Sequence, residues 1–177
     1  MRLALSRPAA PAAAAWRVHL SLLVLASAAI LLLFRRDVAD LLTLWWTSTT
    51  YGHCLFILPV VGWLVWTRRR ELAALRPAAW WPGLALVAAG GAGWLMGEAA
   101  GVAAARHFGV LITLEGAVVT ILGPHVGLAL LFPLAYAFFA IPFGEWLEPP
   151  LQQVTVRIVM PLLHLAGVPA AADGVLI

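Results

Sequence analysis

Five apolar runs, separated by short segments rich in arginine, glycine and proline, constrain the fold more than any other feature of this chain. They cover residues 18–34, 53–66, 80–96, 108–122 and 126–143. Each lies near the lower end of the roughly 17–25 residues that span a bilayer as a helix. Hydrophobic residues make up 63% of the 177 residues and charged residues only 11%, too few to cover a water-soluble domain. The sequence therefore predicts an all-α, polytopic membrane bundle of about five transmembrane helices in one domain, 1–177.

The arginines predict the orientation of these helices. All eleven basic residues are arginines near the ends of apolar runs, and cytoplasmic loops carry the excess of positive charge. With a cytoplasmic N-terminus, residues 1–17 form a cytoplasmic tail, and that side holds seven arginines against four on the outer side. The basic balance is thus a topology signal and a contact for anionic membrane lipid, and nucleic acid is not an expected partner. The basic start resembles a signal peptide, but its small-residue triplet lies inside the apolar run, which indicates an uncleaved anchor.

Residues 45–70 show the membrane order most clearly. Trp45, Trp46 and Tyr51 suit the outer water–lipid boundary, an apolar run follows, and the arginine triplet 68–70 suits the cytoplasmic headgroups. His53, next to Tyr51, is then expected on the outer face. Two interpretations of His53 stay open: a contact with substrate, or an interface histidine with a satisfied hydrogen bond.

Cys54 is the only cysteine, so an internal disulfide and a Cys/His metal cluster are excluded within these 177 residues. Adjacent residues on a helix point about 100° apart, and on this ground Cys54 and His53 are not expected to form the thiol–imidazole pair of a nucleophilic enzyme. We interpret Cys54 as a small buried apolar residue at the start of a span. No metal and no cofactor are expected.

Polar residues in or beside the spans give two further expectations. Glu115 is the one acidic residue near the middle of a predicted span, so it is expected either to be functional or to be a neutral carboxyl bonded to His125 or Thr120 across a helix interface. Glu98, Arg106 and His107 flank an outer loop, where a solvated ion pair is expected.

Glycine and proline predict details of the helix packing. Gly93 and Gly97, Gly97 and Gly101, and Gly123 and Gly127 are each four residues apart, a spacing that lets helix backbones approach closely. Three prolines within or at the ends of spans predict kinks, at positions 59, 133 and 142.

The segment 144–177 differs in kind, because it mixes apolar and polar residues. Gln153, Arg157 and His164 fall within one narrow helical arc, since offsets of four and eleven residues both return close to the start. This pattern predicts an amphipathic segment on the outer face. It either lies in the interface with a wet face, or its polar stripe lines a water-filled cavity near a reacting peptide.

An ordered set of segments resembles the exosortase A group of the exosortase/archaeosortase family. It consists of TYGHCLFILP at 50–59 with the following WLVWTRRR, WWPG at 80–83, GE at 97–98, LGP at 122–124, the stretch LLFPL…IPFGEWLEPPLQQVT, and the closing LAGVPAAADGVLI. The set runs from about Asp40 to Ile177. No single motif is specific, but their order is.

The resemblance implies a multi-pass enzyme of the bacterial inner membrane, a cysteine-type protease and transpeptidase linked to exopolysaccharide production. Its substrates would be exported proteins with a C-terminal sorting signal (PEP-CTERM), made of a Pro-Glu-Pro motif, a transmembrane helix and a basic tail. The family's Cys, Arg and His act at the outer face, where a thiolate attacks the peptide carbonyl.

The nucleophile of exosortases lies in a Glu-Ala-Cys-Ser-Gly type segment beyond the element that here ends at Ile177. The resemblance therefore places the catalytic Cys, Arg and His beyond Ile177, and no catalytic residue carries over to this sequence. The chain alone is expected to be inactive.

Two other classes stay open. A non-enzymatic polytopic membrane subunit or transporter fragment would account for Glu115 and the kinked spans, but it predicts inverted repeat halves. An intramembrane enzyme acting on lipid-linked sugars would need charged clusters in the outer loops, for which Glu145, Glu148 and Asp173 are the candidates.

Overall fold

A computed structural model describes residues 10–142 and 148–167, and in this part of the chain the regular structure is entirely helical. The chain divides into two compact units, Met1–Ile141 and Pro142–Ile177. The first unit holds the following elements: α1 (Ala10–Leu33), α2 (Arg35–Thr47), α3 (Cys54–Thr67), α4 (Arg69–Ala74), η1 (Trp81–Gly83), α5 (Leu84–Ala100), α6 (Ala103–Leu122), α7 (Pro124–Ala129), α8 (Leu131–Ala137) and η2 (Phe138–Ala140). The prediction of an all-α membrane helical bundle is confirmed.

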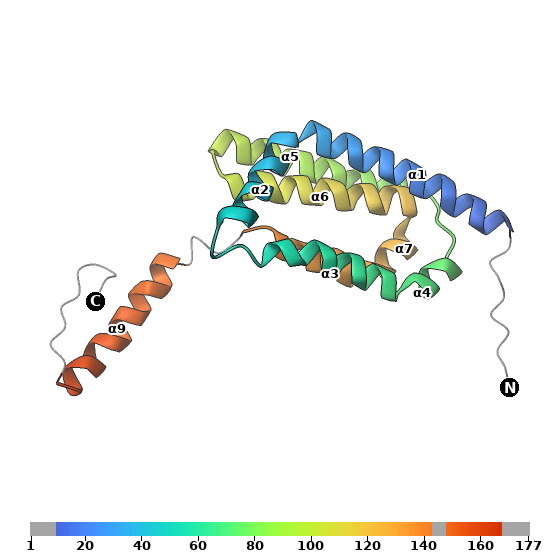
Figure 1. Ribbon diagram of the computed structural model, residues 1–177. Helices are drawn as coiled ribbons and strands as arrows, with labels where there is room; N and C mark the ends of the chain where they lie inside the picture. The colour runs from blue at the N-terminus through green and yellow to red at the C-terminus, as the bar shows by residue number, and fades with distance from the viewer. Residues whose placement is uncertain (1–9, 143–147, 168–177) are drawn as a thin grey trace, which may run out of the picture. The chain divides into compact units, whose positions relative to one another are not determined.

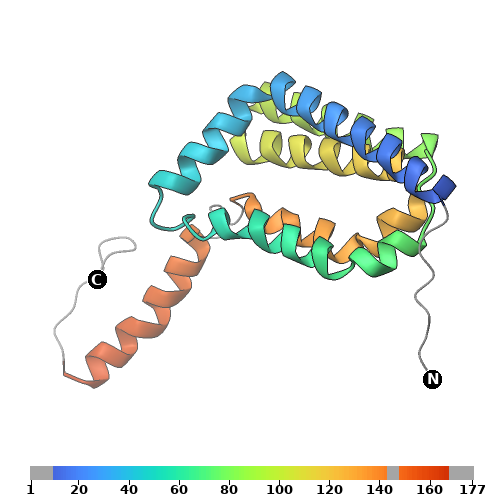
Figure 2. The ribbon, with the colours of Figure 1, turned by 45° about the vertical axis from the view of Figure 1, so that its right-hand side comes forward.

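The helices of the first unit lie in two layers (Figures 1 and 2). One layer contains α1, α5 and α6, and the other contains α3, α4, α7 and α8. The α2 end of the unit holds α2, the turn from α5 to α6 and the start of α3, whereas the α4 end holds α4 and the start of α1. Among the described residues of this unit, Arg17, Arg68, Arg69, Arg70 and Arg76 lie toward the α4 end and Arg35, Arg36 and Arg106 toward the α2 end. This asymmetry is the one from which a cytoplasmic N-terminus was predicted.

Within residues 10–142 and 148–167, three helices are long and apolar enough to cross a bilayer, at Ala14–Leu33, Trp81–Ala100 and Ala103–Leu122. The other two predicted spans correspond to shorter apolar helices, at Cys54–Thr67 and Leu131–Ala140. A helix of the length of α3, 14 residues, rises only about 21 Å, less than the roughly 30 Å hydrocarbon core.

The last predicted span of this unit is interrupted between α7 and α8 near a proline that the sequence singled out. Pro133 has no backbone N–H to give to the carbonyl of Ala129, four residues earlier. That carbonyl instead accepts a hydrogen bond from Arg68 Nη1 at 2.8 Å. An arginine at the end of α3 therefore satisfies a backbone group that the proline frees.

Helices α5 and α6 form the tightest interface, through glycines that repeat every seven residues. A Cβ atom built on Gly90 would lie 2.6 Å from the backbone N of Thr113, and one on Gly109 would lie 2.5 Å from the backbone N of Trp94. Gly83 and Gly97 extend the α5 series, and Gly116 extends the α6 series. Seven residues return almost to the same face after two turns, so two glycine rows meet along both helices.

The predicted four-residue glycine pairs are therefore wrong in part. Gly97 does lie at the interface, but nothing lies within 4 Å of a Cβ built on Gly93. Gly101 has φ of +68° and ends α5, with the Val102 N–H donating to the Gly97 carbonyl at 2.8 Å. This left-handed cap, which favours glycine, turns the chain directly into α6.

The second unit contains α9 (Glu148–Leu165), with Pro161 inside the helix. Among the side chains of α9 that the structure describes, the half-buried ones are apolar, namely Val156, Val159, Met160 and Leu163. Residues 168–177 and Glu145 lie outside the described residues, so the structure bears on only part of the predicted segment 144–177.

Candidate functional site

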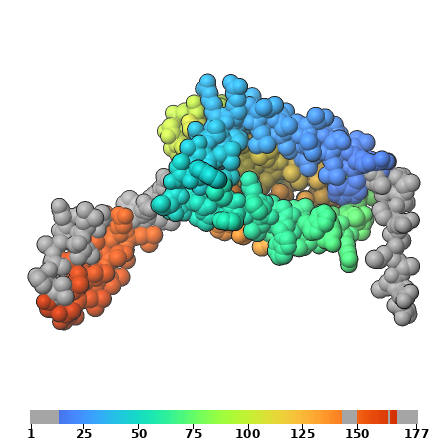
Figure 3. All heavy atoms as spheres, viewed as in Figure 1, coloured from blue at the N-terminus to red at the C-terminus, as the bar shows by residue number. Residues whose placement is uncertain are grey.

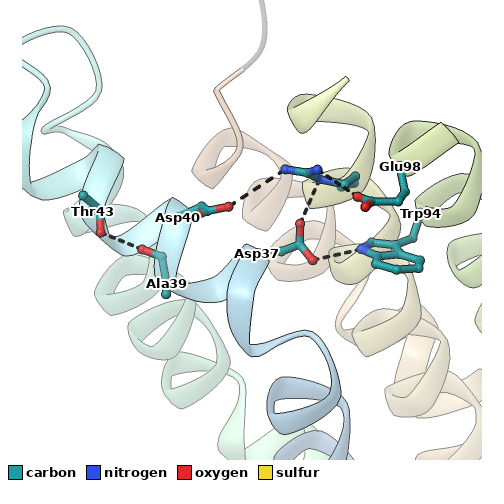
Figure 4. Close-up of polar contacts among 7 residues, drawn as sticks. Asp37, Ala39, Asp40, Thr43, Trp94 and Glu98 are labelled. Atoms are coloured by element: carbon teal, nitrogen blue, oxygen red, sulfur yellow. Dashed lines mark hydrogen bonds and ion pairs between the residues drawn. The ribbon is translucent and has the colours of Figure 1, made fainter. Parts of the chain in front are cut away.

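Charged residues from three helices meet at the α2 end of the first unit. Arg106, in the first turn of α6, lies beside Asp37 and Asp40 of α2 and Glu98 of α5 (Figure 4). Its Nη1 donates to Glu98 Oε2 at 2.8 Å, and its Nε lies 3.0 Å from Asp37 Oδ1. We call this set, with Trp94, the α2 cluster.

Asp37 is the most buried member of the α2 cluster, with 5% of its surface exposed. Its Oδ1 faces Arg106, and its Oδ2 accepts a hydrogen bond from Trp94 Nε1 at 2.9 Å. A buried carboxylate is stable only when it is paired and hydrogen-bonded, and both conditions are met here. The α2 cluster therefore fixes α2 against the α5–α6 hairpin.

The sequence predicted only part of this arrangement. The ion pair between Glu98 and Arg106 is present and exposed on its Glu98 side, but Arg106 also pairs with the buried Asp37. His107 flanks the turn from α5 to α6 as predicted, and α6, which begins at Ala103, buries its side chain. Neither of its ring nitrogens has a hydrogen-bond partner among the residues that the structure describes.

Asp37, Asp40 and His107 offer ligand atoms within 4.8 Å of one another, a spacing that a metal ion can use. The donor set does not favour one, however. Both oxygens of Asp37 are engaged by Arg106 and Trp94. The guanidinium already balances the negative charge, and it would repel a cation bound beside it.

An apolar cavity of 250 Å³ lies next to the α2 cluster, between the two layers. His107 is the polar residue in its lining. The rest comes from α1, α2, α3, α6, α8 and the residues up to Ile141, with Trp45, Leu58 and Val110 among them. The cavity therefore extends from the charged end of α6 to the first half of α3.

The start of α3 brings together three residues that the sequence singled out. Tyr51 is half-buried and packs against the core of Trp45, Cys54, Ile57 and Ala140. His53 is exposed, with its Nδ1 3.0 Å from the carbonyl oxygen of Thr50. The contact with Thr50 supports the interpretation of His53 as an interface histidine with a satisfied hydrogen bond. Its exposure also leaves His53 accessible to a substrate, so both interpretations agree with the structure.

Cys54 lies closer to His53 than predicted. Its Sγ is 3.8 Å from His53 Nε2, so the geometric ground for excluding a thiol–imidazole contact is wrong. The contact forms although His53, the residue before α3, itself has a helical backbone with φ of −66° and ψ of −23°. The interpretation of Cys54 as a buried residue is supported, because it is 1% exposed and its Sγ also contacts the Phe139 carbonyl oxygen at 3.6 Å.

Trp45 differs from expectation, and Glu115 lacks the hydrogen-bond partners that were expected for a neutral carboxyl. Trp45 was expected at the water–lipid boundary, but it is buried and its Nε1 donates to the Ala140 carbonyl at 2.9 Å, which ties α2 to η2. Glu115 does not bond to Thr120, whose hydroxyl donates to Gly116. Within the described residues Glu115 Oε1 is buried and has no hydrogen-bond partner, and His125 is exposed.

Gln153, Arg157 and His164 all lie on α9, as predicted. Gln153 and Arg157 are exposed. They belong to the second unit, whereas Tyr51 and His53 belong to the first.

The sequence reasoning missed Asp37, Asp40 and Trp94. A signal was present, because Asp37 and Asp40 lie within six residues of the end of the first apolar run in a chain with only eight acidic residues. Arg106 likewise stands at the edge of an apolar helix, where a lone cation needs a partner. Their pairing depends on the path of α2, which the apolar runs do not predict.

Comparison with known proteins identifies the chain over most of its length. A family model described as transmembrane exosortase matches residues 45–177, which is 133 of the 177 residues. The matched range includes α3 to α9, and with them Trp94, Glu98 and Arg106 of the α2 cluster. No curated protein and no solved structure matches this chain. The match to the family model covers three quarters of the sequence, and the chain therefore belongs to the transmembrane exosortase family.

Proposed function

We propose that this protein is part of a cysteine-type protease and transpeptidase that processes C-terminal Pro-Glu-Pro sorting signals of exported proteins. The observation that carries the proposal is the family match over residues 45–177. In this proposal the enzyme resides in the bacterial inner membrane with its N-terminus in the cytoplasm, and its activity is linked to exopolysaccharide production. The α2 end then faces outward.

The residues of the α2 end suit a supporting role in such an enzyme. The α2 cluster holds α2 against α5 and α6, and Trp45 holds it against η2. A processing site needs side chains from different spans held in fixed positions, because small displacements reduce catalysis strongly. We infer that Tyr51 and His53, together with Gln153, Arg157 and His164, contact the substrate from this side of the membrane.

Cys54 is not the nucleophile in this proposal. A nucleophilic thiol has to reach the peptide carbonyl, and Cys54 is 1% exposed and enclosed by Trp45, Ile57 and Ala140. The reactive Cys and its cationic partners would instead come from sequence beyond Ile177, as the resemblance implies.

Processing of a tagged substrate tests the proposal. Cells that lack any other exosortase would express a Pro-Glu-Pro tailed substrate with either the chain through Ile177 or a reading frame extended beyond it. We expect the extended protein to produce a shorter substrate band, and the chain through Ile177 to insert into the membrane without producing one.

Two controls sharpen this test. A substrate in which Pro-Glu-Pro is replaced by three alanines should not be processed, and Cys54→Ala in the extended protein should leave processing intact. Failure of the extended wild-type protein to process the tailed substrate, at normal expression, contradicts the proposed function. Loss of processing in Cys54→Ala at an unchanged protein level contradicts the assignment of the nucleophile.

A further inference from the structure

A groove at the α4 end of the first unit lies between α1, α3 and α4. Its volume is 330 Å³, and among its lining residues Arg69 is the charged one. Trp16 and Leu20 of α1 form one wall, and Val65 and Trp66 of α3 form another. Figure 3 views the molecule with α1 in blue above and α3 and α4 in green below.

The walls of this groove are held by contacts that do not involve a ligand. Trp16 Nε1 donates to the carbonyl oxygen of Leu75 at 3.0 Å, which ties α1 to the chain after α4. Leu72 is buried against Leu122, Val126 and Leu130, so α4 is anchored on the opposite side. The groove is therefore preformed.

Arg69 is fixed at the rim by Trp66. Its Cζ lies 4.7 Å from the centroid of the Trp66 ring, and its Nη1 donates to the Trp66 carbonyl oxygen at 2.9 Å. A guanidinium has five N–H donors, so these contacts leave donors for an anion. Arg68 differs, because it does not line the groove and its Nη1 lies 3.7 Å from the carboxylate of Glu71.

An apolar groove with an arginine at its rim matches a molecule that has a hydrocarbon chain and an anionic head. Arginine binds phosphate oxygens well, and basic pockets between transmembrane helices bind anionic lipid headgroups. A transmembrane helix supplies no anion for Arg69, whereas a phospholipid does.

We propose that this groove binds one anionic phospholipid, with an acyl chain against Trp16, Leu20 and Trp66 and the phosphate on Arg69. The site would hold α1 against α3 and α4 and would select lipid by headgroup charge. This proposal is independent of the processing activity, so failure of one leaves the other standing.

Gly62 offers a way to block the chain-binding part of the groove. It lines the groove, and nothing lies within 4 Å of a Cβ built on it. Gly62→Phe therefore adds a ring at the groove from a position where the new Cβ meets no neighbour. Gly91→Phe is the matched control, because Gly91 is equally open but does not line the groove.

Arg69→Gln removes the charge at the rim. Arg70→Gln is its matched control, because Arg70 is an exposed neighbour on the same helix that does not line the groove. The protein would be purified in mild detergent and titrated with phosphatidylglycerol or with phosphatidylcholine of the same acyl chains. Native mass spectrometry would count the lipids retained.

We expect wild-type protein, Arg70→Gln and Gly91→Phe to retain one phosphatidylglycerol at least tenfold more tightly than phosphatidylcholine. Arg69→Gln and Gly62→Phe should each lose that preference, and glycerol phosphate without acyl chains should not compete. Equal retention of both lipids by the wild type overturns the proposal, as does an equal effect of Arg69→Gln and Arg70→Gln. Competition by glycerol phosphate, or full retention by Gly62→Phe, would also overturn it, since the groove would then not hold the chain.

Discussion

Replacing Gly90 by alanine tests the packing of α5 on α6, the tightest interface of the first unit. The new Cβ would lie 2.6 Å from the backbone N of Thr113, whereas favourable contacts of carbon lie at about 3.5–4.0 Å. The neighbour is backbone and cannot rotate away, so the two helices have to separate by about 1 Å. Overpacking of this kind costs about 1–3 kcal/mol.

Gly93→Ala is the matched control on the same helix, because nothing lies within 4 Å of its added Cβ. Both substitutions gain about 1 kcal/mol of helix propensity, so their difference isolates the overpacking. A difference of about 2 kcal/mol corresponds to about 4–8 °C in Tm for chains of this size.

Thermal unfolding of the purified protein in mild detergent, followed by circular dichroism, measures this difference. Gly90→Ala should melt several degrees below Gly93→Ala, and Gly93→Ala should melt at or above the wild type. Equal melting temperatures for the two variants would refute the close approach of the helices.

Three further predictions concern the charged residues. Asp37→Asn should lower the free energy of unfolding by about 3 kcal/mol, because it breaks a buried pair. Asp40→Asn, at an exposed position, should lower it by less than about 1 kcal/mol. Equal losses in denaturant unfolding would contradict the assignment of Asp37 as the buried partner. Arg68→Gln should lower the free energy of unfolding by about 1–3 kcal/mol, because it leaves the carbonyl of Ala129 unsatisfied. The loss should be smaller in a Pro133→Ala background, where a backbone N–H returns to that carbonyl. An unchanged loss in this double-mutant cycle would refute the role of Arg68. A reporter that works only outside the cytoplasm should be active when fused after Gly101 and silent when fused within α4, and the reverse pattern would invert the orientation inferred from the arginines.

The helical membrane class was predictable because it depends on composition and on the length of apolar runs. The glycine interface was predicted with the wrong spacing. Gly93 and Gly97 fit a four-residue motif, but α5 and α6 meet along rows seven residues apart, at Gly90 and Gly97 on one side and Gly109 on the other. Which spacing applies depends on the crossing of the two helices, and a single sequence does not contain that angle.

The residues of the candidate site were predictable where their role is local. Tyr51 and His53 do lie at the start of α3, since a polar segment before an apolar run is fixed by sequence order. Asp37 was not found, because its burial depends on Arg106, 69 positions later in the chain. Trp45 was misplaced for the same reason: its partner is the carbonyl of Ala140.

The identity of the cysteine that carries the substrate tests the proposed enzyme most directly. The protein extended beyond Ile177 would be incubated with a Pro-Glu-Pro tailed substrate and quenched in acid, and its peptides would be mapped by mass spectrometry for a substrate-derived thioester. The proposed function predicts a thioester on a cysteine after Ile177 and an unmodified peptide containing Cys54, whose side chain is buried. A substrate-derived thioester on Cys54 would contradict it.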